Sequence, residues 1–402
     1  MTIILGAGAS GLVTSILLAR NKKEVLLIER QERGGKKILA SGNGRCNISN
    51  IKITKSNFYG NNNQLIDNLI KEYSFDDIKR FFNSIGLELT QNNDGKVFPL
   101  SKQAKSVLNL LEAEVKRLKI KTIYGVKNIN IDNKLNVKID DKCYKAKNII
   151  LATGSLAAQQ LGGNDSGLEI AKQFGHNIIK PLPALVPLQS NNSICKICQG
   201  IKIDAKLILF RDNKEITSKI GDLLFAKYGI SGLATLDISI DVAKEINKSK
   251  NIEIAIDFFY NFSKKELLKF LKSKIDKNRN LPLKLWLNGF INSKISDFII
   301  NKLKFDKIYE RDLNNNDLKE LTQYLKFYKI KIDSLRDFKY AEVAIGGVDT
   351  KEINLNFESK KQKGIFFTGE ILDTVGQRGG YNFTFAWFSA FRVSNYLSQV
   401  LQ

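Results

Sequence analysis

The first thirty residues constrain the fold of this chain more than any other stretch. Three glycines in the spacing G-x-G-x-x-G follow an apolar run, and the residues of this turn are Gly6, Ala7, Gly8, Ala9, Ser10 and Gly11. A helical run to Arg20 and a second apolar run at residues 25–28 come next. This order predicts strand, turn, helix and strand, with the helix N-terminus facing the phosphates of a dinucleotide. Glu29 then lies where a carboxylate can bind both ribose hydroxyls, which favours a bound dinucleotide over an accidental glycine turn.

The length and composition set the broad class of protein. A chain of 402 residues is too long for one simple core, so we expect two or three domains. Hydrophobic residues make up 43% and charged residues 26%, which is typical of a soluble globular protein. No apolar run approaches the roughly 18 residues of a membrane span. Because the first predicted strand begins at residue 2, we also expect no signal segment, a cytoplasmic location and no membrane partner.

The cysteines and the single histidine do not predict a metal site. Cys195 and Cys198 form a C-x-x-C pair, but zinc requires four ligands, and Cys46, Cys143 and His176 lie far away in sequence. Four cysteines are also too few for a disulfide framework in a chain of this length. We therefore expect no bound metal, and we interpret His176 as a packed or turn-capping residue rather than a catalytic base.

A glycine-rich polar loop follows Glu29 and carries Lys36, Lys37 and Arg45. These cations are suited to cover an anionic cofactor. Cys46 lies in the same loop, and a thiol beside Arg45 and backbone amides is expected to have a lowered pKa, with which it could serve as proton donor or nucleophile. The alternative is that Cys46 only packs against the cofactor.

The middle of the first half alternates between helical and extended patterns. Helical spacing over residues 57–119 precedes three short runs, 121–124, 128–131 and 135–139, which predict a small antiparallel layer on a parallel sheet. A buried strand over residues 146–151 then ends in Ala152, Thr153 and Gly154. This turn brings a second strand end to the edge of the sheet where doubly wound folds bind ligands.

The composition changes after residue 181, where three of the five prolines fall within seven residues. The runs 201–209 and 233–240 alternate at period two and predict strands of a small barrel or sheet. From Ser263 to about Tyr328 the spacing is helical, and Ser263 with Glu266 forms a capping box.

The last segment returns to cofactor chemistry. A strand-turn is predicted over 341–348, and a buried strand after Gly364 ends in Gly369, Glu370 and Asp373. Gly379, Gly380, Tyr381 and Asn382 then open a long apolar helix. Acids at a strand end can bind ribityl hydroxyls, and a helix N-terminus can stabilise a reduced anionic ring, which are requirements of a flavin and not of NAD.

The net charge of +22 has two interpretations. Most of the 63 basic residues are lysine, as a coding bias towards A and T would produce. A field of that sign also attracts phosphate backbones regardless of sequence. Residues 243–340 contain 22 basic and 13 acidic side chains, so a solvated helix face and a nucleic-acid surface both remain open there.

Several motifs taken together resemble the bacterial BaiN/YhiN-like FAD-dependent oxidoreductases. They are Gly6 to Gly11, Ser41 to Asn47 (SGNGRCN), Lys96 to Ser101 (KVFPLS), Ala152 to Gly154, Tyr228 to Gly232 (YGISG), Gly346 to Val348, Gly369 to Asp373 (GEILD) and Gly379 to Asn382 (GGYN). The resemblance spans almost the whole chain. It implies an α/β protein of the two-dinucleotide-binding-fold flavoprotein class, with a Rossmann-type FAD-binding domain built from both chain ends and an inserted β-barrel plus helical subdomain.

The expected boundaries and contacts follow from the motifs and the resemblance. The FAD-binding domain comprises residues 1–188 and 341–402, and the insert comprises residues 189–340, with the barrel at about 189–258 and the helical part at about 259–335. The residues expected to contact the cofactor are Gly6, Ala7, Gly8, Ala9, Ser10, Gly11, Glu29, Arg30, Lys36, Lys37, Ser41, Gly42, Arg45, Cys46, Asn47, Val126, Ala152, Thr153, Gly154, Gly369, Glu370, Asp373, Gly379, Gly380, Tyr381 and Asn382. The resemblance alone implies Val126, whose backbone would meet the adenine.

Some positions depart from the family pattern. Lys96 stands where arginine is usual, Ala226 and Ala344 where threonine is usual, and Ser155 where glycine is usual. The Gln377-Arg378 pair before the two glycines is a further departure. The missing threonines put the substrate side in doubt, since their hydroxyls are candidate hydrogen-bond donors to a substrate.

Three functions are compatible with these features. The first is reduction of an activated carbon–carbon double bond with hydride from NAD(P)H through FAD. Since no second G-x-G-x-x-G is present, the reductant is expected to dock transiently. The resemblance implies uridine in 23S ribosomal RNA or an unsaturated steroid ketone as substrate, and the net charge favours RNA. The others are an FAD-dependent amine or aminoketone oxidase and a non-enzymatic flavoprotein.

Overall fold

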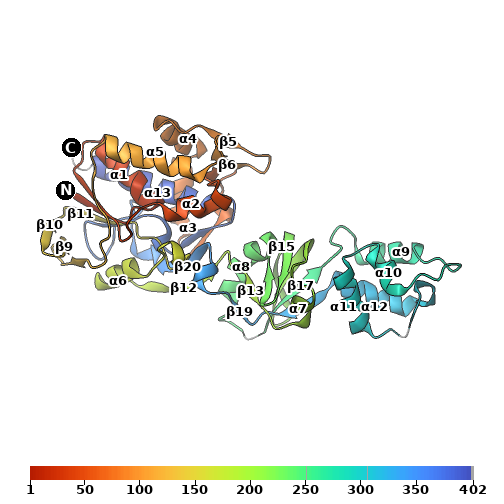
Figure 1. The fold of residues 1–402 in the computed structure, drawn as a ribbon. Coiled ribbons are helices and arrows are strands. Elements are labelled where there is room, and N and C mark those ends of the chain that lie inside the picture. Colours follow the sequence, from red (N-terminus) through yellow and green to blue (C-terminus); the bar gives the residue numbers. More distant parts are fainter. Residues whose placement is uncertain (250, 306, 400–402) are drawn as a thin grey trace. The chain divides into compact units, whose positions relative to one another are not determined.

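The computed structural model describes residues 1–249, 251–305 and 307–399 (Figure 1). Its contacts divide the chain into two compact units. The first unit combines Met1–Leu182 with Glu342–Gln402, and the second is Pro183–Ala341. Each unit encloses a hydrophobic core of its own, so both ends of the chain contribute to the first core.

A five-stranded parallel sheet forms the centre of the first unit, in the order β21-β11-β1-β2-β7. Its strands are β1 (Thr2–Leu5), β2 (Val25–Ile28), β7 (Lys121–Ile123), β11 (Asn148–Leu151) and β21 (Ile365–Phe367). Most of these strands are short apolar runs, as expected when helices cover both faces of a sheet. Strands β2 and β7 extend the sheet on one side of β1, and β11 and β21 extend it on the other. The order in which the chain adds strands therefore reverses direction at β1. Ligands of such sheets bind outside the carboxyl ends of the strands at this reversal.

The run at 121–124 does not join the antiparallel layer that we expected. Its residues form β7, which pairs in parallel with β2, Lys121 opposite Leu26. The antiparallel layer consists of β8 (Asn130–Ile131), β9 (Asn136–Ile139) and β10 (Lys142–Lys145). The long helix α5 (Ala104–Arg117) precedes β7 and returns the chain to the sheet edge, where a parallel strand is the ordinary outcome of a helical crossover.

Helices enclose the sheet of the first unit. Helix α1 (Ala9–Arg20) packs against α5 and against the C-terminal helix α13 (Tyr381–Gln399) (Figure 1). Trp387 of α13 is fully buried and donates its indole N–H to the Ile48 carbonyl, 2.9 Å away. The remaining elements of this unit are α2 (Lys36–Ala40), α3 (Asn63–Glu72), α4 (Phe75–Ser84), α6 (Ser166–Gln173), β3 (Ser49–Asn50), β4 (Phe58–Gly60), β5 (Leu89–Gln91), β6 (Lys96–Pro99), β12 (Ile178–Ala184), β20 (Val343–Val348) and β22 (Thr374–Gly376).

The second unit contains a seven-stranded antiparallel sheet in the order β18-β17-β14-β15-β16-β13-β19. Its strands are β13 (Leu188–Gln189), β14 (Lys202–Arg211), β15 (Lys214–Ala226), β16 (Gly229–Ser231), β17 (Ile252–Asp257), β18 (Tyr328–Lys331) and β19 (Ser334–Leu335). Strands β18 and β19 come from residues that we expected in the helical part. Its helices are α7 (Ser193–Ile197), α8 (Leu233–Glu245), α9 (Lys264–Ser273), α10 (Leu283–Asn288), α11 (Ser293–Leu303) and α12 (Asn315–Lys326).

Two predictions about this unit have different outcomes. The capping box is confirmed, because the Ser263 hydroxyl accepts the Glu266 N–H at 3.2 Å and the Glu266 carboxylate accepts the Ser263 N–H at 2.7 Å. The strand expected at 233–240 is wrong, because these residues form α8. The buried positions include Ala234, Thr235 and Ile238, which share one helical face, so small residues on that face allow close packing on the sheet.

Candidate functional site

The glycine turn lies at the carboxyl edge of the parallel sheet. Gly6 follows β1 directly, Ala152 follows β11, and Glu29 follows β2. The pairing of these strands in register brings the three turns to the same edge, on both sides of the reversal at β1. This edge therefore collects most of the residues that the sequence motifs predicted to bind a dinucleotide.

The glycines of the turn have different physical roles. A Cβ at Gly11 would lie 1.9 Å from the Gly6 carbonyl oxygen, so only glycine lets α1 start this close to the turn. Gly6 has φ +106°, a conformation that other residues rarely adopt. A Cβ at Gly8, in contrast, would meet no protein atom within 4 Å. Gly8 borders open space at the N-terminus of a helix, where the backbone N–H groups and the helix dipole attract a phosphate.

Glu29 is held in place by the backbone around it. Its Oε2 accepts the Ala7 N–H at 2.7 Å and its Oε1 accepts the Gln31 N–H at 2.8 Å. The Val126 N–H donates to the Glu29 carbonyl at 3.1 Å, so Val126 lies beside the acid. Each carboxylate oxygen keeps a further lone pair, which can accept a ribose hydroxyl.

The basic loop begins with α2, and its lysines are engaged by other side chains. The Lys36 ammonium donates to the Gln31 amide oxygen at 2.8 Å, and the Lys37 ammonium is 3.0 Å from the Glu370 carboxylate. Arg45 is exposed, and its side chain has no hydrogen bond or ion pair with the described residues. Of the three cations, only Arg45 offers all of its donors to a ligand.

Cys46 does not have the lowered pKa that we expected. Its side chain is 0% exposed, and burial raises the pKa of the thiol to about 12, although the Ser41 hydroxyl acts in the opposite direction. The thiol therefore stays protonated at neutral pH. A protonated, buried thiol is not an activated nucleophile, so the raised pKa favours proton donation over nucleophilic attack as a chemical role.

The acids after β21 are already engaged by the chain. Glu370 Oε1 accepts the Ser155 hydroxyl at 2.8 Å and the Ala344 N–H at 3.1 Å, and its other oxygen binds Lys37. Asp373 Oδ1 accepts the Gly346 N–H at 3.1 Å. These acids tie β20 and the loop of Lys37 to the strand end, which positions the residues around the sheet edge.

The start of α13 is fixed by side-chain bonds to the preceding turn. The Asn382 amide accepts the Gly376 N–H at 2.8 Å and donates to the Gly376 carbonyl at 2.9 Å. A Cβ at Gly380 would lie 2.4 Å from the Ser49 carbonyl oxygen, so the helix start and β3 approach closely. The Tyr381 hydroxyl donates to the Lys52 carbonyl at 3.0 Å.

Unsatisfied polar atoms test whether this edge fits a flavin dinucleotide. Asn47 Oδ1 is buried and has no hydrogen-bond partner among the described residues. Thr153 Oγ1 also lacks one, but it packs against Gly167 of α6 and is therefore no test of the cofactor site. A Cβ at Gly154, where φ is +73°, would meet nothing within 4 Å. An orphaned amide oxygen in the basic loop and open glycines at the sheet edge are features that a polar cofactor completes, so the residues present fit FAD.

Comparison with known proteins establishes the family. Residues 1–396 match the family described as HI0933-like protein Rossmann domain. The chain belongs to this family. It is a Rossmann-type FAD-dependent oxidoreductase, which confirms the fold class and the family resemblance.

Relatives of this HI0933-like chain carry two kinds of name. A 3-dehydro-bile acid delta(4,6)-reductase of Clostridium scindens is 31% identical over 395 residues, with 96% of each chain covered. A ribosomal RNA dihydrouridine synthase of Haemophilus influenzae is 29% identical, with 97% of this chain and 96% of that protein covered. The crystal structure of 3-ketosteroid delta1-dehydrogenase from Sterolibacterium denitrificans superposes with a TM-score of 0.52 at 9% identity and 99% coverage of both chains, which shows a shared fold.

Membrane and metal features were also searched in this HI0933-like chain. Within 1–249, 251–305 and 307–399, no helix is long and apolar enough to cross a membrane. The same residues contain no group of three or more His, Cys, Asp or Glu side chains that could hold a metal ion.

Sequence reasoning missed the part played by Ser155, which we noted only as a departure from the family pattern. Its hydroxyl binds a carboxylate 215 positions away in the chain. Asn50 was also missed, although its amide donates to the Gly379 carbonyl at 3.2 Å. No local pattern signals such contacts, because both partners reach the site from distant segments.

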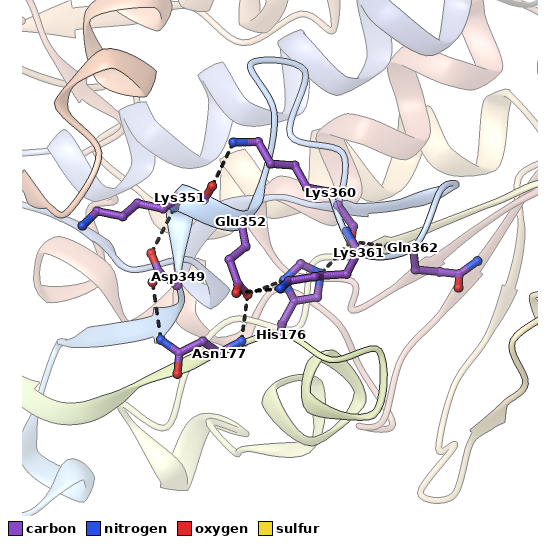
Figure 2. Close-up of polar contacts among 9 residues, drawn as sticks. His176, Asn177, Asp349, Lys351, Glu352, Lys360, Lys361 and Gln362 are labelled. Carbon is purple, nitrogen blue, oxygen red and sulfur yellow. Dashed lines mark hydrogen bonds and ion pairs between the residues drawn. The ribbon is translucent and has the colours of Figure 1, made fainter.

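His176 is the buried member of a second polar cluster of the first unit, which Figure 2 shows. Its Nε2 is 2.6 Å from the Ser359 hydroxyl and its Nδ1 is 3.3 Å from Glu352. Glu352 also accepts the Asn177 N–H at 2.8 Å and lies 3.2 Å from the Lys361 ammonium. Burial lowers the pKa of His176, against the opposing effect of Glu352, so the ring is neutral at pH 7. Each charge of this cluster is balanced within the chain.

Proposed function

We propose that this chain reduces an activated carbon–carbon double bond, and that uridine in 23S ribosomal RNA is its substrate. The observation that carries the proposal is similarity along nearly the whole chain to relatives named for a bile acid reductase and for a ribosomal RNA dihydrouridine synthase. Both names describe the addition of hydrogen across a conjugated double bond. Reduction is therefore the chemistry that the two kinds of relative share.

FAD would lie at the carboxyl edge of the parallel sheet. The backbone around Gly8 would hold the pyrophosphate and Glu29 the adenosine ribose, with Val126 beside the adenine. The start of α13 would stabilise negative charge on the reduced ring. The remaining residues expected to contact FAD would complete the site. They are Arg30, the loop from Lys36 to Asn47, the turn from Ala152 to Gly154, and Gly369 to Asp373. When bound, FAD supplies hydride transfer, with NAD(P)H as the transient reductant.

Cys46 is proposed as the proton donor of the reaction. A hydride added to one carbon of the double bond requires a proton on the other. The thiol is protonated at neutral pH and lies in the loop expected to cover the cofactor. Its alternative role, packing against the cofactor, predicts unchanged turnover when the thiol is removed.

The charge of the chain supports RNA over a steroid. Of the net charge of +22, a substantial share lies on residues 243–340 of the second unit. Helix α9 exposes Lys265, Lys269 and Lys272 beside its buried apolar stripe. Such a face binds phosphate backbones without reading sequence. The steroid alternative has its own support, the 31% identity to the bile acid reductase.

Counting dihydrouridine in ribosomal RNA tests the proposal. Cells with and without this chain are compared by mass spectrometry of digested large-subunit RNA, and the deleted strain receives either the wild-type chain or Glu29→Ala. We expect one or more dihydrouridines to vanish on deletion and to return with the wild-type chain. A count that does not change refutes the RNA substrate, and the purified protein is then assayed with an unsaturated steroid ketone and NAD(P)H.

A further inference from the structure

One arginine of the second unit is held by aromatic rings and by no polar group. The guanidinium carbon of Arg336 lies 3.4 Å from the ring centroid of Tyr340 and 4.0 Å from that of Tyr228. The backbone fixes all three residues, since the Arg336 N–H donates to the Pro187 carbonyl, the Tyr340 N–H to the Asp337 carbonyl, and the Tyr228 carbonyl accepts the Ser190 N–H. The two rings therefore hold the guanidinium in a defined orientation.

The hydrogen-bonding groups of this arginine are unused. In the described parts of the chain, the Arg336 guanidinium has no ion pair and no hydrogen bond, even with the neighbouring Asp337. Three other arginines are paired with acids: Arg20 and Arg117 both bind Glu114, and Arg211 binds Glu245. A guanidinium carries five N–H donors in one plane, and stacking on ring faces leaves all five free at the edge of that plane.

The stack is bordered by an accessible aromatic ring, two exposed lysines and one exposed acid, Asp337. Tyr340 is 43% exposed. Lys227 and Lys339, the neighbours of the two tyrosines in sequence, are exposed as well, and the Lys339 ammonium lies 5.8 Å from the Tyr340 ring centroid. A planar donor set, two cations and an accessible aromatic ring are the components with which proteins bind single-stranded nucleic acid.

We propose that Arg336, held between Tyr228 and Tyr340, binds a backbone phosphate of single-stranded RNA. Two parallel N–H groups of a guanidinium match two oxygens of a phosphate. The tyrosines hold the side chain in its binding orientation, so less conformational entropy is lost when the phosphate arrives. This inference rests on the proposed RNA substrate and adds the residue that grips it.

Fluorescence anisotropy with a labelled 20-residue oligouridylate tests this site in the full-length FAD-loaded protein. Affinity is measured at several KCl concentrations for the wild type, Arg336→Ala, Arg336→Lys and Lys116→Ala. Lys116 is an exposed position of α5 in the first unit, so its variant loses the same charge away from the stack. Flavin content and melting temperature are recorded for each variant.

We expect Arg336→Ala to weaken binding about tenfold at low salt, as for the loss of a charge-assisted hydrogen bond. The slope of log affinity against log salt should fall by about 0.7, the value for one phosphate contact on a single strand. Arg336→Lys should retain most of the slope but lose part of the affinity, because a lysine cannot stack or bind in a bidentate manner. Lys116→Ala should match the wild type.

Two results would overturn the inference in different ways. If the wild type binds the oligouridylate and Arg336→Ala binds it with the same affinity and slope, the stack is only a structural pin, and a lower melting temperature of that variant would be its signature. If the wild type does not bind and the dihydrouridine count is also unchanged by deletion, the RNA substrate itself is refuted. Should Arg336→Ala fail to fold, the affinity of Arg336→Lys decides: a loss of affinity with most of the slope retained supports the site, and an affinity equal to that of the wild type overturns it.

Discussion

The His176 cluster and the Arg336 stack are two polar centres of opposite kind. Around His176, the carboxylate of Glu352 meets an imidazole, a backbone N–H and the Lys361 ammonium, so the charge of this acid is balanced inside the protein. Arg336 has two ring faces as partners and no acceptor for its donors in the described residues. A polar group whose partners come from the chain has a structural role. A polar group that is held in place without a hydrogen-bond partner is expected to bind a ligand.

The edge of the parallel sheet combines both kinds of group. Glu370 is engaged by Lys37, Ser155 and a backbone N–H, which is the closed pattern of the His176 cluster. Gly8 and Gly154 are open, because a Cβ at either position would meet no protein atom within 4 Å. The cofactor site thus consists of side chains that are bonded to one another around a few positions that no protein atom fills.

The largest expected effect comes from paired substitutions in the glycine turn. Gly11→Ala places a Cβ 1.9 Å from the Gly6 carbonyl oxygen, so it should destabilise the protein by about 1–3 kcal/mol or more and abolish FAD binding. Gly8→Ala should change the stability of the FAD-free protein by less than about 1 kcal/mol, yet also lose FAD. Urea unfolding of the FAD-free protein and flavin absorbance of the purified protein distinguish these outcomes. Normal FAD binding by Gly8→Ala would show that the open space is not a phosphate site.

The next effect concerns the buried thiol. Cys46→Ala should slow turnover about a hundredfold while flavin content stays normal, because it removes the proposed proton donor and leaves the proposed phosphate and ribose contacts at Gly8 and Glu29 in place. Cys143→Ala is the matched control, since Cys143 is exposed. Steady-state rates with a fixed substrate and measured flavin occupancy provide the test. An unchanged rate would leave Cys46 with a packing role alone.

A smaller effect is expected at the acid after β2. Glu29→Ala removes the acceptor of the Ala7 and Gln31 N–H groups together with the proposed ribose contact, so FAD affinity should fall about tenfold to a hundredfold. Glu29→Gln keeps one oxygen acceptor, so its FAD affinity should lie between those of the wild type and Glu29→Ala. Fluorescence titration of the FAD-free protein with FAD measures the three affinities. Equal affinities would mean that Glu29 only shapes the turn.

The smallest effect tests the closed cluster. Because burial lowers the pKa of His176 below the usual 6.5, the unfolded chain takes up a proton before the folded one does. The contribution of His176 to stability is therefore complete above about pH 6.5 and is lost as the pH falls below it. His176 is the only histidine, so a single imidazole resonance in proton NMR reports its pKa directly.

The matched variant for this titration is His176→Gln. The difference in unfolding free energy between the wild type and His176→Gln should shrink from about pH 7 to about pH 5. A pKa at or above the usual value, or a difference independent of pH, would show that the cluster is not closed to solvent and protons.

Local sequence patterns predicted a large part of the fold. The turn from Gly6 to Gly11, the capping box at Ser263 and the helix after Gly380 each depend on residues close together in the chain, so their spacing was sufficient. The strand expected at 233–240 was wrong because small residues such as Ala234 and Ser239 suit either period, and packing of α8 on the sheet selected the helix. The lowered pKa of Cys46 was wrong for a similar reason, since burial of the thiol is a tertiary property.

The sequence by itself determined that this chain builds a dinucleotide turn, because glycine at fixed spacing is a local steric requirement. It also identified the family through motifs scattered over the chain. Only the tertiary structure decided which charged groups have partners within the chain and which are left to bind a ligand. Ser155 meets Glu370 across 215 positions, and Arg336 meets Tyr228 of a distant segment, because such contacts depend on where folding places the parts of the chain.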